Sequence, residues 1–487
     1  MGDFDVAYPE YAATSRLDDL RATEYGYLDD GGHIYLDYTG AGLPSRSQLR
    51  VHARRIRAGA YGNPHSENPT SRASTEMIDQ ARAAILKFFN ASPRDYAVIF
   101  TPNATGACRL VAESYPFGLG KRLVLTADNH NSVNGIREFA RAGGAHLRYV
   151  SLTRDLRVDE TDLNLALGRG HGSRPGLFAY PAQSNFTGVQ HPLSWVTRAQ
   201  EAGYDVLLDA AAYVPTSRLD LSEVAPEFVT VSWYKVFGYP TGVGCLLARH
   251  DAMARLRRPW FSGGTIWGVS VQGSWHKLLR SEAAFEDGTV NFLSIPDVTT
   301  GIDWIGDIGM DLIAARVAML TNWLLQSLAG LKHSNGVPLL LLYGPGPRPS
   351  DGLAGRGGTI AFNFLDPTGS LVDERAVSRD AAAAGISLRT GCFCNPGAGE
   401  WAFGLTRKAV GGTFVRRAIM RRSFLRPDMT TVDDYLGVVG LPTGGAVRVS
   451  VGLPSTLADI ECFLDFAERT YRDRMPDLAG LSPRLNC

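Results

Sequence analysis

Two residues at the ends of consecutive apolar runs could together hold a cofactor ring. The run 206–208 ends at Asp209, and the run 228–231 leads through a polar turn to Lys235. A lysine amine can form an imine with an aldehyde, and a carboxylate can pair with a protonated ring nitrogen, so the pair suits the two ends of pyridoxal phosphate. Lysines are also common on solvated turns, and the pair taken alone favours that plainer interpretation.

The composition narrows the class of protein. The chain has 487 residues, 45% of them hydrophobic and 20% charged, as expected for two or three folded domains or for one large and one smaller domain. The formal net charge is zero, which gives no support to binding of nucleic acid or of an anionic membrane surface. Chemistry based on lysine has six candidates: Lys87, Lys121, Lys235, Lys277, Lys332 and Lys408.

The lack of a recognisable targeting signal and the cysteine usage predict a cytoplasmic protein. No charged N-terminal region leads into an apolar core, so we expect no signal peptide. No apolar run reaches the roughly 18 residues of a membrane span, so we expect no contact with a membrane interior. The six cysteines are sparse for this length and predict no disulfide framework, which makes a reducing cytosol the default expectation.

Apolar runs that alternate with helical stretches predict βαβ units and a mostly parallel sheet covered on both faces. Ligands of such sheets bind beyond the carboxyl ends of the strands, where Asp209, Ser232 and Lys235 fall. We expect an N-terminal arm at 1–30, a large domain at 31–325 and a smaller α+β domain at 326–487. The expected strands are 97–100, 123–125, 147–150, 176–180, 206–208, 228–231 and 243–247 in the large domain, and 359–364 and 446–451 in the small one.

Three further polar segments follow expected strands, and each has a plainer interpretation. The stretch 101–106 precedes a helix and could bind a phosphate with its N–H groups and hydroxyls, but it also suits an ordinary capped helix and lacks a Walker sequence. His130 could stack on a cofactor ring or be a loop histidine satisfied by backbone groups. The stretch 183–185 could bond a phenolic ring oxygen or serve a turn.

Cysteine and arginine residues near the C-terminus leave similar choices open. Cys392 and Cys394 form a Cys-x-Cys pair with no second ligand pair, which is weak support for zinc, and we expect no metal. A loop thiol near Arg389 could be a nucleophile, although an inert thiol is the commoner case. Arg448 lies in an apolar strand, where its planar fork suits either a substrate carboxylate or a structural ion pair.

The order and spacing of several short sequence motifs are more specific than any one of these motifs alone. Over roughly residues 30–455 the chain resembles the class V aminotransferase group of fold-type-I pyridoxal phosphate enzymes, most closely the cysteine-desulfurase-like domain of molybdenum cofactor sulfurases. The matching words are Tyr35-Leu36-Asp37, Gly40-Ala41-Gly42-Leu43, Tyr61-Gly62-Asn63-Pro64-His65-Ser66, Asp128-Asn129-His130-Asn131-Ser132-Val133, Tyr180-Pro181-Ala182-Gln183-Ser184-Asn185-Phe186-Thr187-Gly188, Tyr234-Lys235-Val236-Phe237-Gly238-Tyr239-Pro240-Thr241-Gly242 and Arg389-Thr390-Gly391-Cys392-Phe393-Cys394-Asn395-Pro396-Gly397.

This resemblance implies a fold and a set of roles. It implies an α/β fold-type-I transferase with a mostly parallel seven-stranded sheet, a smaller α+β domain and a homodimer. Lys235 would be the Schiff-base lysine and the proton carrier, Cys394 the persulfide cysteine, and Arg448 the partner of the substrate α-carboxylate with Arg389 and Asn185 beside it. The other residues implied to bind pyridoxal 5'-phosphate are Asp209, His130, Thr105, Ala104, Gln183, Asn185, Ser232 and Tyr234, with Gly264 and Thr265 reaching the phosphate from the partner subunit. Gln183 would replace the glutamine that the family usually has at the position of Ala212.

Three functions remain open at this point. The first is a desulfurase that breaks the C–S bond of L-cysteine or a cysteine S-conjugate and holds the sulfur as a persulfide on Cys394 before passing it to an acceptor. The second is a stand-alone biosynthetic enzyme that acts on an S-substituted cysteine by β-elimination, decarboxylation or deamination, without a persulfide. The third is a non-enzymatic binding scaffold that has lost its chemistry. The joint presence of five residues argues against it: Lys235, Asp209, His130, Arg448 and Cys394.

Overall fold

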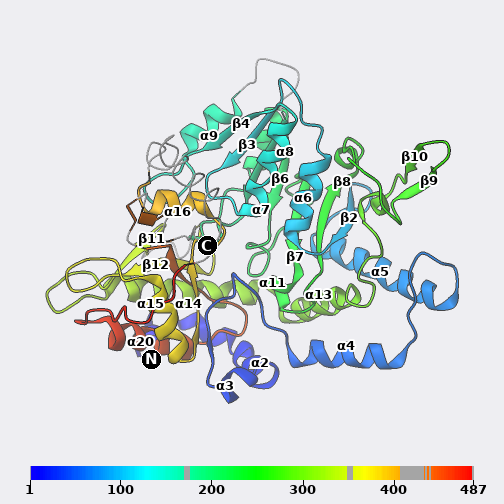
Figure 1. Cartoon of the computed structure of the whole chain (residues 1–487). Coiled ribbons are helices and arrows are strands. Elements are labelled where there is room, and N and C mark those ends of the chain that lie inside the picture. The colour runs from blue at the N-terminus through cyan, green and yellow to red at the C-terminus, as the bar shows by residue number, and fades with distance from the viewer. Residues whose placement is uncertain are drawn as a thin grey trace.

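The computed structural model describes residues 2–168, 176–347, 355–405, 433, 436–437, 440–441 and 443–484. A seven-stranded sheet forms its centre (Figure 1), in the order β2-β8-β7-β6-β5-β3-β4. All pairs are parallel except those of β8, which is antiparallel to both β2 and β7. The expected mostly parallel sheet is confirmed. Its strands are β2 (Tyr96–Thr101), β3 (Arg122–Thr126), β4 (His146–Val150), β5 (Gly176–Pro181), β6 (Tyr204–Asp209), β7 (Phe228–Ser232) and β8 (Gly244–Arg249).

Both faces of this sheet are covered by helices. Strand β3 shows this, because its successive side chains point to opposite faces. Leu123 and Leu125 of β3 belong to an apolar cluster with residues of α6, α7, α8 and α12. Val124 between them belongs to a second cluster that takes in residues of α5, α10 and α13 on the other face. The helices of these layers are α5 (Pro69–Phe88), α6 (Ala104–Ser114), α7 (Asn131–Asn134), α8 (Ile136–Ala142), α9 (Glu160–Leu167), α10 (Trp195–Glu201), α11 (Trp233–Phe237), α12 (His250–Met253) and α13 (Pro296–Ile308). The helix α4 (Arg46–Ala58) packs on α13.

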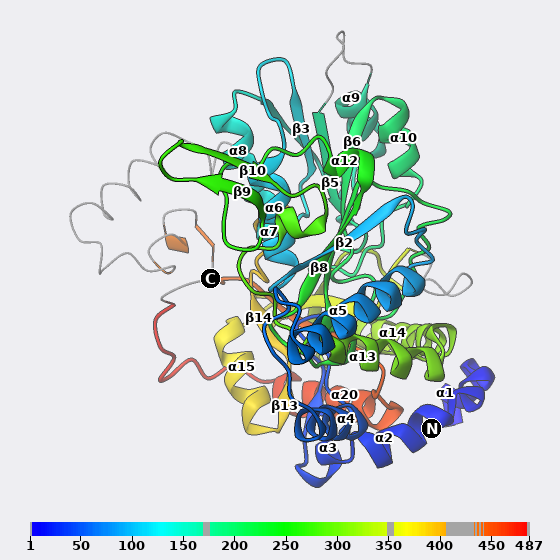
Figure 2. The same ribbon diagram turned by 90° about the vertical axis from the view of Figure 1, so that its right-hand side faces the viewer.

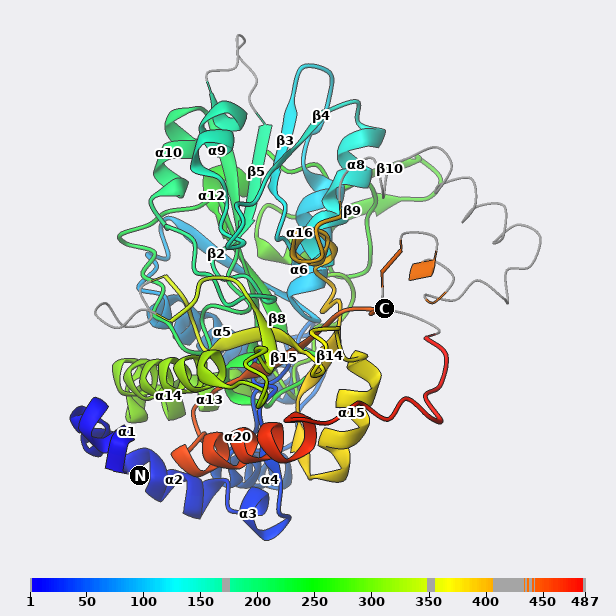
Figure 3. The same cartoon turned by 90° about the vertical axis from the view of Figure 1, so that its left-hand side faces the viewer.

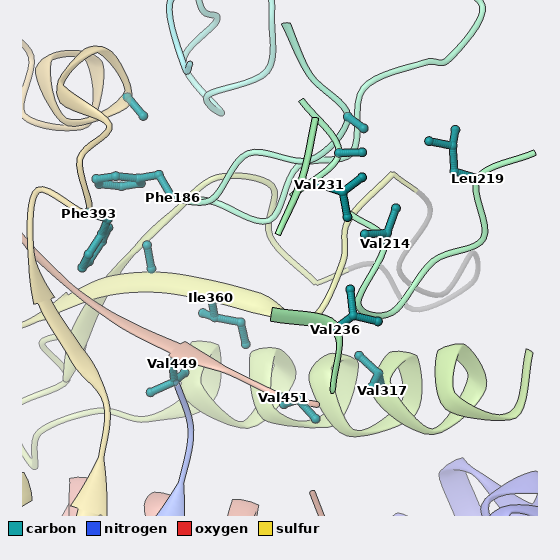
Figure 4. Packing of buried hydrophobic residues seen from close by; sticks show 14 of the residues in the cluster. Phe186, Val214, Leu219, Val231, Val236, Val317, Ile360, Phe393, Val449 and Val451 are labelled. Carbon is teal, nitrogen blue, oxygen red and sulfur yellow. The ribbon is translucent and has the colours of Figure 1, made fainter. Parts of the chain in front are cut away.

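A smaller four-stranded sheet, in the order β11-β12-β15-β14, lies beside the large one (Figure 3). All its pairs are antiparallel. Ile360, Val449 and Val451 of this region belong to one apolar cluster with Val317 of α14 (Figure 4). The elements are α14 (Met310–Gly330), β11 (Leu340–Tyr343), β12 (Thr359–Phe364), α15 (Glu374–Ala383), β13 (Ile386–Ser387), β14 (Arg389–Gly391), α16 (Pro396–Ala402), β15 (Ala446–Ser450) and α20 (Leu457–Tyr471). The boundary expected at 325/326 falls inside α14, and the domain limits stay a prediction.

The N-terminal residues fold onto the rest of the chain. They form α1 (Gly2–Ala7), a 3-10 turn at Pro9–Thr14, α2 (Arg16–Glu24), α3 (Tyr27–Asp30) and β1 (Ile34–Tyr35), which pairs with β13. Arg316 of α14 is fully buried and donates to both carboxylate oxygens of Asp18, at 2.7 and 2.8 Å. This ion pair joins α2 to α14.

Two other features complete the fold. A hairpin of β9 (Ile266–Ser270) and β10 (Trp275–Leu278) stands away from the large sheet (Figure 2), and a 3-10 turn follows at Glu282–Phe285. One described helix, α14, is long and apolar enough to cross a membrane, yet 56% of its most apolar stretch is buried inside the molecule. Core helices meet the same criteria, so α14 is weak support for a span.

Candidate active site

A cavity of about 160 Å³ opens at the carboxyl ends of β5, β6 and β7, where parallel sheets bind ligands. Most of the site residues expected from the sequence line this cavity. Nine of them line it: Lys235, Asp209, His130, Thr105, Ala104, Gln183, Asn185, Ser232 and Tyr234. Asn103, Ser132, Pro181, Ala211 and Ala212 complete the wall.

Asp209 is the last residue of β6 and is buried. Its Oδ1 accepts hydrogen bonds from the Thr230 hydroxyl and the Ala211 amide, both at 3.1 Å. No described residue donates to Oδ2, so one oxygen of a fixed carboxylate is left for a ligand. A buried acid with a free acceptor suits a protonated ring nitrogen.

Lys235 lies on the short helix α11, directly after β7. Desolvation lowers the pKa of its amine, the charge of Asp209 raises it, and Arg448 lowers it again. The net direction is downward, which favours the neutral, nucleophilic amine. The glycine turn at 40–42 packs closely against this helix: a Cβ on Gly42 would lie 2.9 Å from the Lys235 carbonyl oxygen.

His130 is held at the start of α7 as the helix N-cap. Its Nδ1 accepts the Ser132 amide at 3.1 Å, which leaves the ring proton on Nε2 in the neutral form. Burial lowers the pKa of His130, and so does the charge of Lys235, against an opposing effect of Asp209. The imidazole therefore stays neutral to lower pH than an ordinary histidine.

Hydroxyls and amides gather at the start of α6. The Ala104 amide donates to the Ser232 hydroxyl at 2.9 Å, and the Thr105 and Ser132 hydroxyls lie 2.6 Å apart. Asn103 caps the helix by accepting from the Gly106 amide at 2.9 Å. A helix start with hydroxyls nearby is a good phosphate site.

Gln183 and Asn185 follow β5 and are both buried. Gln183 Oε1 accepts from Gln190 at 3.1 Å. Asn185 bonds to the cysteine loop: its amide donates to the Phe393 carbonyl at 2.7 Å, and its Oδ1 accepts from Asn395 at 2.9 Å. Asn185 therefore joins the large sheet to the cysteine loop.

The cysteine loop passes beside the cavity without contributing to its lining. Cys394 is an exposed free thiol, and its carbonyl accepts the Asn131 amide at 2.7 Å, next to His130. Phe393 and Cys394 have φ values of +54° and +53°, in the left-handed region. The Phe393 ring packs on Phe186 at 5.1 Å (Figure 4). Cys392, whose role the sequence left open, is disulfide-bonded.

Arg448 on β15 is 4% exposed and has an ion-pair partner that was not expected from the sequence. It donates to Asp37 Oδ1 and to the Asn185 carbonyl, both at 2.9 Å. Arg389 donates to Asp37 Oδ2 through Nε at 3.0 Å and Nη2 at 2.6 Å. Asp37 thus touches both arginines. The only indication of Asp37 in the sequence was its place in the motif Tyr35-Leu36-Asp37.

Gly264 and Thr265 lie outside this cavity, before β9. The Thr265 side chain is buried, donates to the Ser262 carbonyl at 2.8 Å and accepts the Ser262 amide at 3.0 Å. In this chain its hydroxyl is therefore already bonded. Within the described ranges, no three His, Cys, Asp or Glu side chains gather in a way that would hold a metal ion.

The residues present fit pyridoxal phosphate. A desolvated amine, a carboxylate with a free oxygen, a neutral imidazole and a capped helix start line one cavity. The sequence also matches the model of the class-V aminotransferases over residues 34–463.

The chain belongs to the class-V aminotransferase family.

Members of this family depend on pyridoxal phosphate. Molybdenum cofactor sulfurases of Bos taurus and Homo sapiens are each 36% identical to the chain, over 92% and 96% of its length. The Arabidopsis thaliana molybdenum cofactor sulfurase is 34% identical over 96%. The chain spans only 51%, 53% and 59% of these three relatives, so it matches their desulfurase part.

Solved structures support the fold. A cysteine desulfurase of Thermococcus onnurineus NA1 has a TM-score of 0.74 at 22% identity, with 93% of this chain and 97% of that chain covered. A cysteine desulfurase of Escherichia coli has a TM-score of 0.70 at 19% identity, with coverages of 93% and 98%. The class-V chain described here therefore has the fold-type-I architecture expected from its sequence.

Proposed function

We propose that this class-V enzyme uses pyridoxal phosphate to break the C–S bond of L-cysteine or a cysteine S-conjugate, with Cys394 taking the sulfur of L-cysteine as a persulfide. The observation that supports the proposal most strongly is that hydrogen bonds hold the cysteine loop beside the cavity. The Cys394 carbonyl accepts from Asn131, and the Phe393 carbonyl accepts from Asn185. The names of the relatives reported above, molybdenum cofactor sulfurases, agree with this chemistry.

The cavity residues divide the work of binding and proton transfer. Pyridoxal phosphate, when bound, supplies an electron sink that weakens the bonds at the substrate Cα. Asp209 would keep the ring nitrogen protonated through its free Oδ2, and the start of α6 would take the phosphate. Lys235 Nζ would remove the Cα proton, a task for which its lowered pKa suits it.

The sulfur step needs a thiolate at Cys394. Its sulfur attacks the substrate sulfur, an S–S bond forms, and the Cβ–S bond breaks. The electron pair of the broken bond stays with the carbon, which takes one proton to leave alanine, while the sulfur remains as the persulfide of Cys394. A molecule that accepts this sulfur, and a homodimer whose second subunit brings Gly264 and Thr265 to the phosphate, belong to the same proposal. A cytoplasmic location does too.

The test separates the persulfide from simple elimination. We expect Cys394→Ala to lose sulfur release from L-cysteine while pyridoxal phosphate still binds, because the thiol takes no part in holding the cofactor. Cys462→Ala is the matched control, since Cys462 is also an exposed free thiol and lies on α20. Alanine, sulfide and pyruvate would be measured with L-cysteine and with S-methyl-L-cysteine.

A second outcome would reject the persulfide. If Cys394→Ala turns over S-methyl-L-cysteine at the wild-type rate and releases pyruvate, the enzyme is a C–S lyase that needs no nucleophilic thiol. A purified protein that stays colourless with added pyridoxal phosphate would reject the enzyme proposal altogether.

A further inference from the structure

Two arginines face one another across a strand pair at the edge of the candidate site. The register of β14 and β15 sets Arg389 directly opposite Arg448. Like charges in that position destabilise a sheet pair, so the arrangement requires an anion. Asp37 meets this need, with Oδ1 on Arg448 at 2.9 Å and Oδ2 on Arg389 at 2.6 Å.

One carboxylate balances only half of this charge. Two guanidinium groups and one carboxylate leave a single positive charge. The Arg448 side chain is 4% exposed, and its Nε has no hydrogen-bond acceptor among the described residues. A buried cation with an unused donor is costly unless an anion completes it. The seat formed by Asp37, Arg389 and Arg448 therefore lacks one negative charge.

The neighbouring turn fixes Asp37 in place. A Cβ added at Gly40 would lie 2.6 Å from Asp37 Oδ2 and 2.7 Å from Arg389 Nη2. A larger residue there would push the carboxylate off the arginines. The Thr39 amide after Asp37 is also bonded, to the Ser450 hydroxyl on β15 at 2.9 Å.

The same glycine turn that contacts Asp37 also contacts the Lys235 segment, because a Cβ at Gly42 would lie 2.9 Å from the Lys235 carbonyl oxygen. After desolvation and the charge of Asp209, the largest influences on the pKa of Lys235 are Arg448, Asp37 and Arg389, in that order. An amino acid whose amine reaches Lys235 would therefore bring its carboxylate near these charges.

We propose that Asp37 is a specificity-determining residue: by cancelling one of two arginine charges, it restricts the seat to amino acids that bring one carboxylate and disfavours those that bring two. The proposal rests on the proposed function only in taking an amino acid as the substrate. It goes beyond that function by assigning the substrate's charge to a residue that makes no contact with the cofactor cavity.

The test compares two amino acids that contain no sulfur. L-Alanine and L-aspartate would be titrated into the holoenzyme, and the absorbance change of the bound cofactor and the heat of binding would both be followed. The wild type should prefer L-alanine. Asp37→Asn adds one positive charge to the seat, so the ratio of aspartate to alanine affinity should rise at least about tenfold.

Three further variants make the result specific. Asp37→Glu keeps the charge and should keep the wild-type ratio. Arg389→Gln combined with Asp37→Asn returns the seat to one net positive charge and should restore the preference for L-alanine. Asp18→Asn removes a similar pair from buried Arg316, away from the cavity, and should leave the ratio unchanged.

The proposal is overturned if Asp37→Asn keeps the wild-type ratio, or if the double variant keeps the ratio of the single one. Should Asp37→Asn fail to fold, Arg389→Gln alone decides, because Arg389 is half exposed and its loss should weaken L-alanine binding about tenfold. Neither ligand has a C–S bond, so a negative result with Cys394→Ala does not affect this test.

Discussion

The Asn185 side-chain amide donates a 2.7 Å hydrogen bond to the carbonyl oxygen of Phe393, the residue before Cys394. The bond joins the end of β5 to a turn in which two consecutive non-glycine residues have positive φ. Such residues cost roughly 1–2 kcal/mol each, so the turn persists only where other contacts hold it. Asn185 and Asn395 supply those contacts.

Asn185→Ala should release this turn. We expect at least about a tenfold loss of sulfur release from L-cysteine, because a small misplacement of a reacting group lowers the rate steeply. Asn335→Ala is the control, since Asn335 also donates to a carbonyl, that of Pro367 at 2.8 Å, on an exposed loop. Equal activity of the two variants would show that the anchor has no part in positioning Cys394.

The lowered pKa of Lys235 predicts a pH dependence of stability. The unfolded chain holds the lysine proton up to an ordinary pKa of about 10.4, whereas the folded chain releases it earlier. Between the lowered value and about 10.4 the unfolded state binds more protons, so the unfolding free energy of the apo-protein should rise with pH. Below the lowered value this gain is absent.

Urea unfolding of the apo-protein from pH 7 to pH 10.5 would show the rise. Lys235→Met removes the amine, so the rise of the unfolding free energy with pH that is due to Lys235 should disappear. An identical pH slope in both proteins would contradict a depressed lysine pKa.

The ion pair between Asp18 and Arg316 predicts that the N-terminal helices stabilise the core. Asp18→Asn should lower the unfolding free energy by about 2 kcal/mol, because a fully buried guanidinium loses its charged partner. Asp19→Asn is the control on the same helix, since Asp19 is exposed and forms no ion pair among the described residues. Equal melting temperatures for the two variants would refute this role.

The seven strands of the large sheet could be predicted because each is a short apolar run between polar segments. Strands buried on both faces need no alternation, and β5 and β7 are buried throughout. The hairpin of β9 and β10 escaped prediction because its residues are largely exposed. The N-terminal helices escaped it too, because α2 has no apolar periodicity and buries only Leu17 and Arg21.

The cavity could be predicted in outline because Asp209, Ser232 and Lys235 each follow a strand, and strand ends meet at one edge of the sheet. The function of Asp37 could not be predicted in this way. Its partners Arg389 and Arg448 lie 352 and 411 residues away in the chain. Only the register of β14 and β15 brings the two arginines together, and no local pattern encodes that register.

The last of the described strands, β15, is an inner strand of its sheet, between β12 and β14. During synthesis β12 and β14 leave the ribosome before β15, the strand that pairs with both of them. Until residue 450 emerges, the nascent chain presents unpaired strand edges, which can recruit other chains. Because Arg448 arrives on that same strand, closure of the small sheet and pairing of Arg448 with Asp37 become possible together.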